Sequence, residues 1–280
     1  MLLLLLATCT LPGQSVVVKN NIEYAKGLQL NLARPAKINK PRPCVICLHG
    51  GGYTGGHRSA FDGFIKKLAE HDFVGVTVSY RLAPKAKWPA PVHDARAAIR
   101  FLRKNAKTYG IAPDHIGVMG HSAGAHLAQF LGVTNDIVRY GGGPSNKKPS
   151  GKVQCVVTWA QASDFTREYG IWKTAGPSFK KILGAELSVA TRRLHIKASP
   201  LFWVTPAAAP SLIIHGTDDK EVLFAQSVWI YNRLKSAEVD ARLLGLRGAG
   251  HSLGGKHRAR AEAATIKFFK EKLNTSTKRK

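Results

Sequence analysis

A serine between two glycines, placed at a predicted strand-to-helix turn, is the feature that most constrains this chain. Residues 116–119 are a short apolar run typical of a buried strand, and residues 125–131 show the small-residue pattern of a helix. The pentapeptide Gly-His-Ser-Ala-Gly at 120–124 joins them. So sharp a turn strains the serine backbone and crowds its neighbours, so that only glycine fits on either side. We therefore expect the Ser122 hydroxyl to stand exposed above the end of a sheet.

Apolar runs alternate with helical patterns along most of the chain. Strands are predicted at 44–48, 74–80, 116–119, 153–159, 212–215 and 241–246, and helices at 59–71, 91–109, 125–131, 222–234 and 261–269. This alternation implies right-handed crossovers and one mostly parallel sheet covered by helices on both faces. Short antiparallel strands at 16–18, 22–24 and 28–32 are expected at its edge. The prediction is an α/β fold with a single domain over residues 16–273, in which residues 164–210 are irregular.

The charge balance is strongly basic, with 42 Lys and Arg against 17 Asp and Glu and a net charge of +25. Such a charge attracts polyanions, although it also serves solubility. The positive charges are scattered along the chain, and the one dense cluster lies in the basic tail at 274–280. No basic stretch is interleaved with aromatic residues as a nucleic-acid site requires. An anionic polysaccharide therefore stays a candidate partner, and nucleic acid is not expected.

The first 15 residues resemble the apolar core of a signal peptide that lacks its basic start, and they are too short to span a bilayer. We therefore expect a secreted or periplasmic protein. Leu-Ala-Thr-Cys at 6–9 also resembles a lipoprotein cleavage box, so anchoring through Cys9 is an alternative. Cys44, Cys47 and Cys155 lie in predicted strands and are interpreted as small buried hydrophobic residues. No spacing of His and Cys matches a metal site.

Three other stretches carry residues that could act with Ser122. The loop His-Gly-Gly-Gly at 49–52 follows a predicted strand, and its glycines let backbone N–H groups approach a substrate closely. Asp218 and Asp219 follow another strand, and either carboxylate could orient a histidine. His251 lies in a Gly-flanked loop after the last predicted strand, from which an imidazole can reach over the sheet edge. Serine, acid and base then follow the chain order of the α/β-hydrolase fold, and we favour Asp219 as the acid.

The remaining histidines fit the role of base less well. His121 and His126 flank the serine too closely to reach back onto it, and His49 is expected to hold its own loop by hydrogen bonding. Glu221 is interpreted as a charge at the N-terminus of the helix predicted over 222–234.

Together these motifs resemble the hormone-sensitive-lipase-like branch of the α/β-hydrolases, and within it the bacterial carbohydrate esterases of the acetylxylan and feruloyl type. The motifs at 49–52 and 120–124 are hallmarks of that branch, as is Ser-Tyr-Arg-Leu-Ala-Pro at 79–84. His-Gly-Thr-Asp-Asp at 215–219 supports the resemblance, which covers about residues 22–269.

The resemblance implies a serine carboxylesterase that acts through an acyl-enzyme on short-chain acyl or aryl esters, with acetyl and feruloyl groups on plant polysaccharide among the candidates. The roles it implies are Ser122 as nucleophile, His251 as base and Asp219 as acid, with the N–H groups of Gly51, Gly52 and Ala123 as oxyanion donors. It also implies a small lid at about 164–200. Tyr53 and Trp172 are expected to contact the substrate. No cofactor and no metal are required.

Two other functions stay open at this point. The stretch Gly-His-Ser-Ala-Gly-Ala-His at 120–126 has Ala125 where many esterases have another glycine, and it also resembles kynurenine formamidases. An arylformamidase that cuts an N-formyl amide is therefore the enzymatic alternative. The non-enzymatic alternative is an inactive hydrolase fold that binds polyanions, against which the intact serine, acid, base and oxyanion loop argue.

Overall fold

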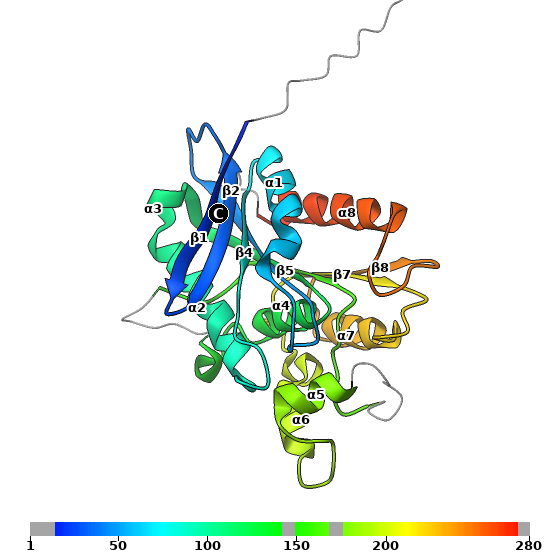
Figure 1. Ribbon diagram of the computed structural model, residues 1–280. Coiled ribbons are helices and arrows are strands. Elements are labelled where there is room, and N and C mark those ends of the chain that lie inside the picture. Colours follow the sequence, from blue (N-terminus) through cyan, green and yellow to red (C-terminus); the bar gives the residue numbers. More distant parts are fainter. Residues whose placement is uncertain (1–14, 142–148, 168–175, 274–280) are drawn as a thin grey trace, which may run out of the picture.

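The computed structural model describes residues 15–141, 149–167 and 176–273 (Figure 1). The predicted leader with Cys9, the basic tail and Trp172 lie outside the described residues.

A single eight-stranded sheet forms the centre of the molecule, in the order β1-β2-β4-β3-β5-β6-β7-β8. Its strands are β1 (Val16–Ala25), β2 (Leu28–Pro35), β3 (Arg42–Leu48), β4 (Val74–Val78), β5 (Ile111–His121), β6 (Cys155–Trp159), β7 (Ser211–Gly216) and β8 (Ala241–Leu246). The neighbouring strands β4, β3, β5, β6, β7 and β8 run parallel. At the edge, β1 pairs antiparallel with β2, and β2 pairs antiparallel with β4. The predicted α/β class and mostly parallel sheet are confirmed.

Helices cover both faces of the sheet (Figure 1). The α-helices are α1 (Asp62–Glu70), α2 (Ala90–Lys104), α3 (Ala106–Tyr109), α4 (Ala123–Val133), α5 (Gly176–Leu183), α6 (Arg192–Ala198), α7 (Ala225–Ser236) and α8 (Lys256–Lys272), and the 3₁₀ helices are η1 (Arg58–Phe61), η2 (Val138–Tyr140) and η3 (Pro200–Trp203). Side chains of α1 and α8 share one core cluster, and those of α2 and α4 share the cluster on the opposite face.

The alternation of side chains along β3 explains its two cysteines. Cys44 and Ile46 face the cluster of α2 and α4, whereas Val45 and Cys47 face the cluster of α1 and α8. Both cysteines are fully buried free thiols, as is Cys155, and burial raises the pKa of all three. The interpretation of these cysteines as small core residues is confirmed.

Several predicted boundaries were wrong. The predicted strands at 16–18 and 22–24 are one strand, β1, with an irregularity between Lys19 and Ile22. The helix predicted over 91–109 is two helices, because α2 ends at Lys104. The helix predicted from 222 begins only at Ala225. In each case the hydrophobic pattern located the element, and local backbone geometry moved its ends.

The segment between β6 and β7 is more ordered than the prediction of an irregular stretch. It contains α5, α6 and η3, and it lies against α4 and α7 at one end of the sheet (Figure 1). Phe165 stacks on Phe179 of α5 with ring centroids 4.2 Å apart, and the N–H of Trp88 donates to the carbonyl of Ile182. The buried side chains of α5, Phe179, Ile182 and Leu183, lie on one face of the helix, so packing against the domain stabilises an element this short.

A buried arginine on α2 fixes the C-terminal end of α4, the helix that begins after Ser122. Arg96 is fully buried and donates to the carbonyl oxygens of Leu131 and Thr134. A cation there satisfies carbonyls that no helical N–H reaches and complements the helix dipole. Burial lowers the pKa of Arg96 to about 9, so its guanidinium still carries a charge at neutral pH.

Within the described residues, no helix is long and apolar enough to cross a membrane.

Candidate active site

The turn that carries Ser122 has the strained geometry that its sequence predicts. Ser122 lies between β5 and α4 with φ 53° and ψ −121°, a region that residues other than glycine rarely adopt. A Cβ atom on Gly120 would lie 2.2 Å from the carbonyl oxygen of Gly124, and one on Gly124 would lie 2.1 Å from that of Leu48. The expectation that only glycine fits at both positions is confirmed.

Hydrogen bonds connect Ser122, His251 and Asp219 in a single chain. His251 Nε2 lies 2.8 Å from Ser122 Oγ, and His251 Nδ1 lies 2.7 Å from Asp219 Oδ2. With Asp219 ionised, Nδ1–H donates to the carboxylate, and Nε2 is left to accept the proton of the serine hydroxyl. Asp218 is exposed and accepts a hydrogen bond from Thr217. The structure therefore places Asp219, and not Asp218, against His251.

Asp219 is held as a carboxylate by its neighbours. Burial by itself would raise the pKa of Asp219, but hydrogen bonds from His215 and His251 outweigh it and hold the pKa well below its usual range. Its Oδ1 also accepts the backbone N–H groups of Glu221 and Val222.

His215 positions the carboxylate of Asp219, a role that was not predicted from the sequence. Its Nε2 lies 2.9 Å from Asp219 Oδ2, and its Nδ1 lies 2.6 Å from Ser227 Oγ. The histidine that opens the stretch at 215–219 was the signal that could have identified it.

His121 supports the loop that carries the base. As expected, it does not reach the serine hydroxyl; its Nε2 lies 2.9 Å from the backbone carbonyl oxygen of His251. Burial lowers the pKa of His121 from 6.5 to about 4, so the ring stays neutral and Nε2–H donates to that carbonyl. His126 points away on α4, where its Nε2 lies 2.8 Å from the carbonyl oxygen of Ala198.

The Gly-rich loop packs directly on the serine turn. A Cβ atom on Gly50 would lie 3.2 Å from the Cβ of Ser122, and Gly51 and Gly52 have φ of 116° and 58°. His49 holds this loop as expected, because its Nδ1 lies 2.7 Å from the carbonyl oxygen of Gly50. The ring of Tyr80 stacks on His49 with centroids 4.3 Å apart.

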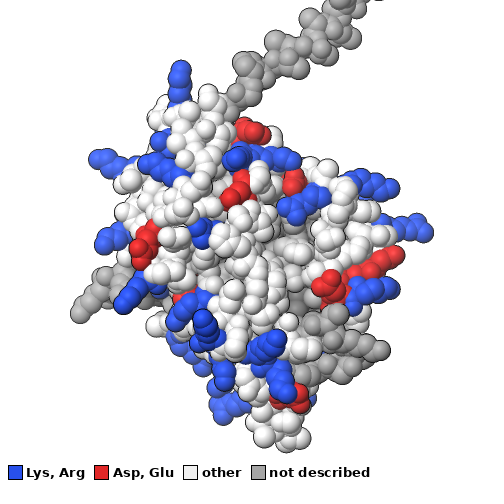
Figure 2. Space-filling model, viewed as in Figure 1, with Lys and Arg blue, Asp and Glu red and all other residues white. Residues whose placement is uncertain are grey.

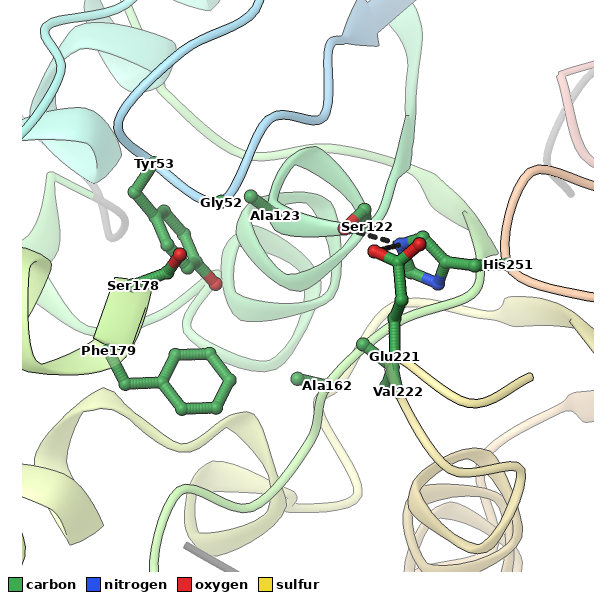
Figure 3. A pocket seen from close by; sticks show the side chains of 10 residues that line it. All are labelled: Gly52, Tyr53, Ser122, Ala123, Ala162, Ser178, Phe179, Glu221, Val222 and His251. Carbon is green, nitrogen blue, oxygen red and sulfur yellow. Dashed lines mark hydrogen bonds and ion pairs between the residues drawn. The ribbon is translucent and has the colours of Figure 1, made fainter. Parts of the chain in front are cut away.

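Of the three predicted oxyanion donors, Gly52 and Ala123 line the cavity beside Ser122 (Figure 3). Ala123 is the first residue of α4, so its N–H has no partner within the helix. Gly51 belongs to the same turn but does not line the cavity, and its carbonyl accepts the N–H groups of Thr54 and Gly55.

A cavity of about 80 Å³ opens next to Ser122. Its lining residues are Gly52, Tyr53, Ser122, Ala123, Ala162, Ser178, Phe179, Glu221, Val222 and His251 (Figure 3). Tyr53 was predicted to contact the substrate, and its buried hydroxyl has no hydrogen-bond partner among the described residues. Ser178 and Phe179 come from α5, and no sequence motif marked them.

The interpretation of Glu221 as a helix N-terminal charge was wrong. Because α7 begins at Ala225, Glu221 lies in the loop before it and lines the cavity next to His251.

Among the described residues, no three His, Cys, Asp or Glu side chains are grouped so that they could hold a metal ion.

Comparison with known proteins identifies the family of the chain. The model of the BD-FAE family matches residues 30–234, which is more than half of the chain. The chain belongs to the BD-FAE family. The match confirms the resemblance to hormone-sensitive-lipase-like esterases that the motifs indicated.

Curated proteins similar to this BD-FAE chain are named as esterases. The probable carboxylic ester hydrolase LipM of Mycobacterium tuberculosis is 25% identical over 89% of this chain and 59% of its own length. Esterase LipQ of the same organism is 29% identical over 74% of this chain and 50% of its own length. The chain thus spans between 50% and 59% of the length of these two relatives.

Solved structures with the same fold include carbohydrate esterases. A truncated carbohydrate esterase from gut microbiota has a TM-score of 0.81 and 24% identity, over 94% of this chain and 98% of its own. The acetyl ester-xyloside bifunctional hydrolase of Caldicellulosiruptor lactoaceticus has a TM-score of 0.73 and 25% identity, over 87% and 88% of the two chains. These likenesses confirm the α/β-hydrolase fold.

Proposed function

We propose that this protein is a serine carboxylesterase that hydrolyses short-chain esters through an acyl-enzyme. The observation that carries the proposal is the position of His251, whose two ring nitrogens contact Ser122 Oγ and Asp219 Oδ2 at 2.8 and 2.7 Å. A hydroxyl that shares its proton with an oriented imidazole is an activated nucleophile.

In the first half of the reaction, Ser122 Oγ forms a bond to the ester carbonyl carbon while His251 Nε2 takes the hydroxyl proton. The negative oxygen of the tetrahedral intermediate is met by the N–H groups of Gly52 and Ala123. The bond to the alcohol oxygen then breaks, and Nε2–H gives its proton to that oxygen. In the second half, water attacks the acyl-serine while His251 Nε2 takes a proton from the water. The bond to Ser122 Oγ then breaks, Nε2–H returns the proton to Oγ, and the carboxylic acid is released.

The size of the cavity favours small acyl groups. The cavity of about 80 Å³ lies between the serine turn and α5, and Phe179 and Tyr53 form its aromatic wall. An acetyl group fits such a space, whereas a long chain would have to displace these buried rings. We therefore assign acetyl and other short acyl esters of sugars as the substrate class, and rank the larger feruloyl group behind them because its ring would have to displace the same side chains.

The basic surface suits a polysaccharide that carries negative charge. Lys and Arg side chains are spread over the face shown in Figure 2, with acidic side chains among them. If they attract a glucuronate-bearing chain, kcat/KM on acetylated glucuronoxylan falls as salt rises to 1 M, where the Debye length is about 3 Å. On neutral p-nitrophenyl acetate kcat/KM stays constant. Equal salt dependence on both substrates would contradict this use of the charge.

Export stays a prediction, because residues 1–14 lie outside the described residues.

One panel of substrates tests the proposed function. Initial rates are measured on p-nitrophenyl acetate, butyrate and octanoate, methyl ferulate, acetylated xylan and N-formylkynurenine, with Ser122→Ala as the blank. We expect the acetyl and butyryl esters to react fastest and the variant to lose about four to six orders of magnitude in kcat. Highest kcat/KM on N-formylkynurenine would favour the arylformamidase. No Ser122-dependent reaction on any of them would favour the inactive binding protein.

A further inference from the structure

Glu221 places a carboxylate beside the proton-carrying atom of the site. Its Oε2 lies 3.8 Å from His251 Nε2, the same nitrogen that contacts Ser122 (Figure 3). Its backbone N–H donates to Asp219 Oδ1 at 2.8 Å, and this bond fixes the loop from which the side chain extends. The side chain is 59% exposed, so it stands at the mouth of the cavity and not in its interior.

Neither the serine chemistry nor the fold accounts for this acid. Asp219 already supplies the carboxylate that orients the imidazole, on the opposite ring nitrogen. The first turn of α7 contains no acidic residue, so Glu221 does not serve that helix. Within the described residues, His251 is the only basic side chain with a nitrogen within 4.0 Å of this carboxylate, at 3.8 Å, in a chain with 42 Lys and Arg and 17 Asp and Glu. It is also the only carboxylate among the ten residues that line the cavity.

The position of Glu221 identifies the part of the substrate that it meets. His251 Nε2 must give its proton to the oxygen of the departing alcohol, so that oxygen lies within hydrogen-bond distance of Nε2. In the proposed reaction we place the acyl group in the part of the cavity bounded by Phe179 and Tyr53, which lies across Ser122 from His251 (Figure 3). A carboxylate 3.8 Å from Nε2 on the solvent side therefore borders the alcohol and not the acyl group.

Resting on the proposed function, we infer that Glu221 is a specificity-determining residue for the alcohol part of the ester. Its carboxylate accepts hydrogen bonds from hydroxyl groups next to the ester oxygen, as a sugar presents them, and attracts a positive charge there. It repels a carboxylate in the same place. The enzyme therefore selects esters of polyols and of cationic alcohols over esters of hydroxy acids. A uronate in a polysaccharide substrate has to lie away from the sugar that carries the ester.

The test compares four acetate esters that share one acyl group: acetylcholine, O-acetylglycolate, glycerol monoacetate and 2-methoxyethyl acetate. Rates are followed by proton release at 0.15 M salt for the wild type, Glu221→Gln, Glu221→Lys and Glu221→Ala. Ratios between substrates are compared across variants, so differences in the intrinsic reactivity of the esters cancel. Asp218→Asn is the matched control, because it removes one exposed carboxylate from the same loop outside the cavity lining.

We expect the kcat/KM ratio of acetylcholine to O-acetylglycolate to fall about tenfold in Glu221→Gln and about a hundredfold in Glu221→Lys. The ratio of glycerol monoacetate to 2-methoxyethyl acetate falls about fivefold in Glu221→Ala, because a charge-assisted hydrogen bond is lost. Asp218→Asn keeps both ratios within about twofold of the wild type.

The outcomes separate this inference from the proposed function. Hydrolysis that depends on Ser122 but shows wild-type ratios in every Glu221 variant would overturn the role of Glu221 and leave the esterase intact. A uniform loss of rate on all four esters, with unchanged ratios, would mean that Glu221 only supports the loop of Asp219. A wild-type protein that hydrolyses none of the four esters would remove the proposed function and this inference with it.

Discussion

The two walls of the cavity are built by different means. On one wall, the turns around Ser122 and Gly52 follow strand ends, and a Cβ atom on Gly51, Gly120 or Gly124 would lie within 2.3 Å of a backbone oxygen. On the other wall, Phe179 comes from a short helix that is held by stacking on Phe165. Backbone packing fixes atoms to a few tenths of an ångström, whereas aromatic packing tolerates exchange. The chemistry is therefore assigned to the first wall and the choice of acyl group to the second.

After the loss of the nucleophile itself, the largest effect on kcat is expected from the acid. Asp219→Asn removes the carboxylate that holds Nδ1–H of His251, so the ring adopts the wrong tautomer and kcat falls about ten-thousand-fold. Asp218→Asn leaves kcat almost unchanged, because the carboxylate of Asp218 is exposed and accepts a hydrogen bond from the neighbouring Thr217 instead of contacting His251. Steady-state kinetics on p-nitrophenyl acetate compare the two, and a greater loss in Asp218→Asn would exchange their roles.

Crowding at the serine turn gives the next effect. In Gly124→Ala the new Cβ meets the carbonyl oxygens of Leu48 and His49 at 2.1 and 2.4 Å, so one turn must move. We expect a loss of more than about a hundredfold in kcat, because displacement of reacting groups by about 1 Å costs that much. Gly63→Ala on α1 is the control, since nothing lies within 4 Å of its Cβ. It raises the free energy of unfolding by about 0.5–1 kcal/mol. Equal activity of both variants would contradict rigid packing of the first wall.

Where the two walls meet, His126 makes stability depend on pH. It stacks on Phe165, and burial lowers its pKa from 6.5 to about 4. The pKa of His126 is lower in the folded protein than in the unfolded chain. The contribution of the neutral buried ring to the free energy of unfolding is therefore fully present above pH 6.5 and is lost as the pH falls toward 4. Between pH 7.5 and 5 this loss amounts to about 2 kcal/mol.

Urea titrations at pH 7.5 and at pH 5 measure this loss in the free energy of unfolding. His126→Gln cannot titrate, so the difference between its free energies of unfolding at pH 7.5 and 5 is smaller than in the wild type by that amount. Asp219 does not interfere, since its contribution is lost only below its ordinary pKa of 3.8. An unchanged pH dependence in the variant would show that His126 is not held neutral by burial.

The smallest effect concerns the second wall. Phe179→Leu keeps the residue apolar but enlarges the cavity, so the kcat/KM ratio of p-nitrophenyl butyrate to acetate rises about fivefold while the rate on acetate changes little. Phe202→Leu is the control, because Phe202 is 46% exposed and lies outside the lining. A fall of all rates by a common factor in Phe179→Leu would mean that this wall also positions the reacting groups.

The same contrast explains how far the sequence could predict the site. Gly120, Gly124 and Ser122 belong to one short turn, so their roles follow from local sterics, and Asp219 and His251 follow from motifs at strand ends. Phe179 comes from a short helix within the stretch that the sequence predicted to be irregular, and its tertiary packing on Phe165 and Tyr53 brings it to the cavity. Glu221 was misassigned because α7 begins three residues later than the pattern indicated. The parallel part of the sheet was predictable because each of its strands carries its own apolar run, whereas β1 is interrupted by polar residues and was predicted as two strands.

The central claim is that Ser122 is the nucleophile, and covalent labelling tests it most directly. The protein is treated with a fluorophosphonate, which forms a stable bond to an activated serine, and is examined by intact mass and peptide mapping. We predict one adduct, on the peptide that contains Ser122, with none on Ser122→Ala and much slower labelling of His251→Gln. A label on another residue, or equal labelling of Ser122→Ala, would contradict the account.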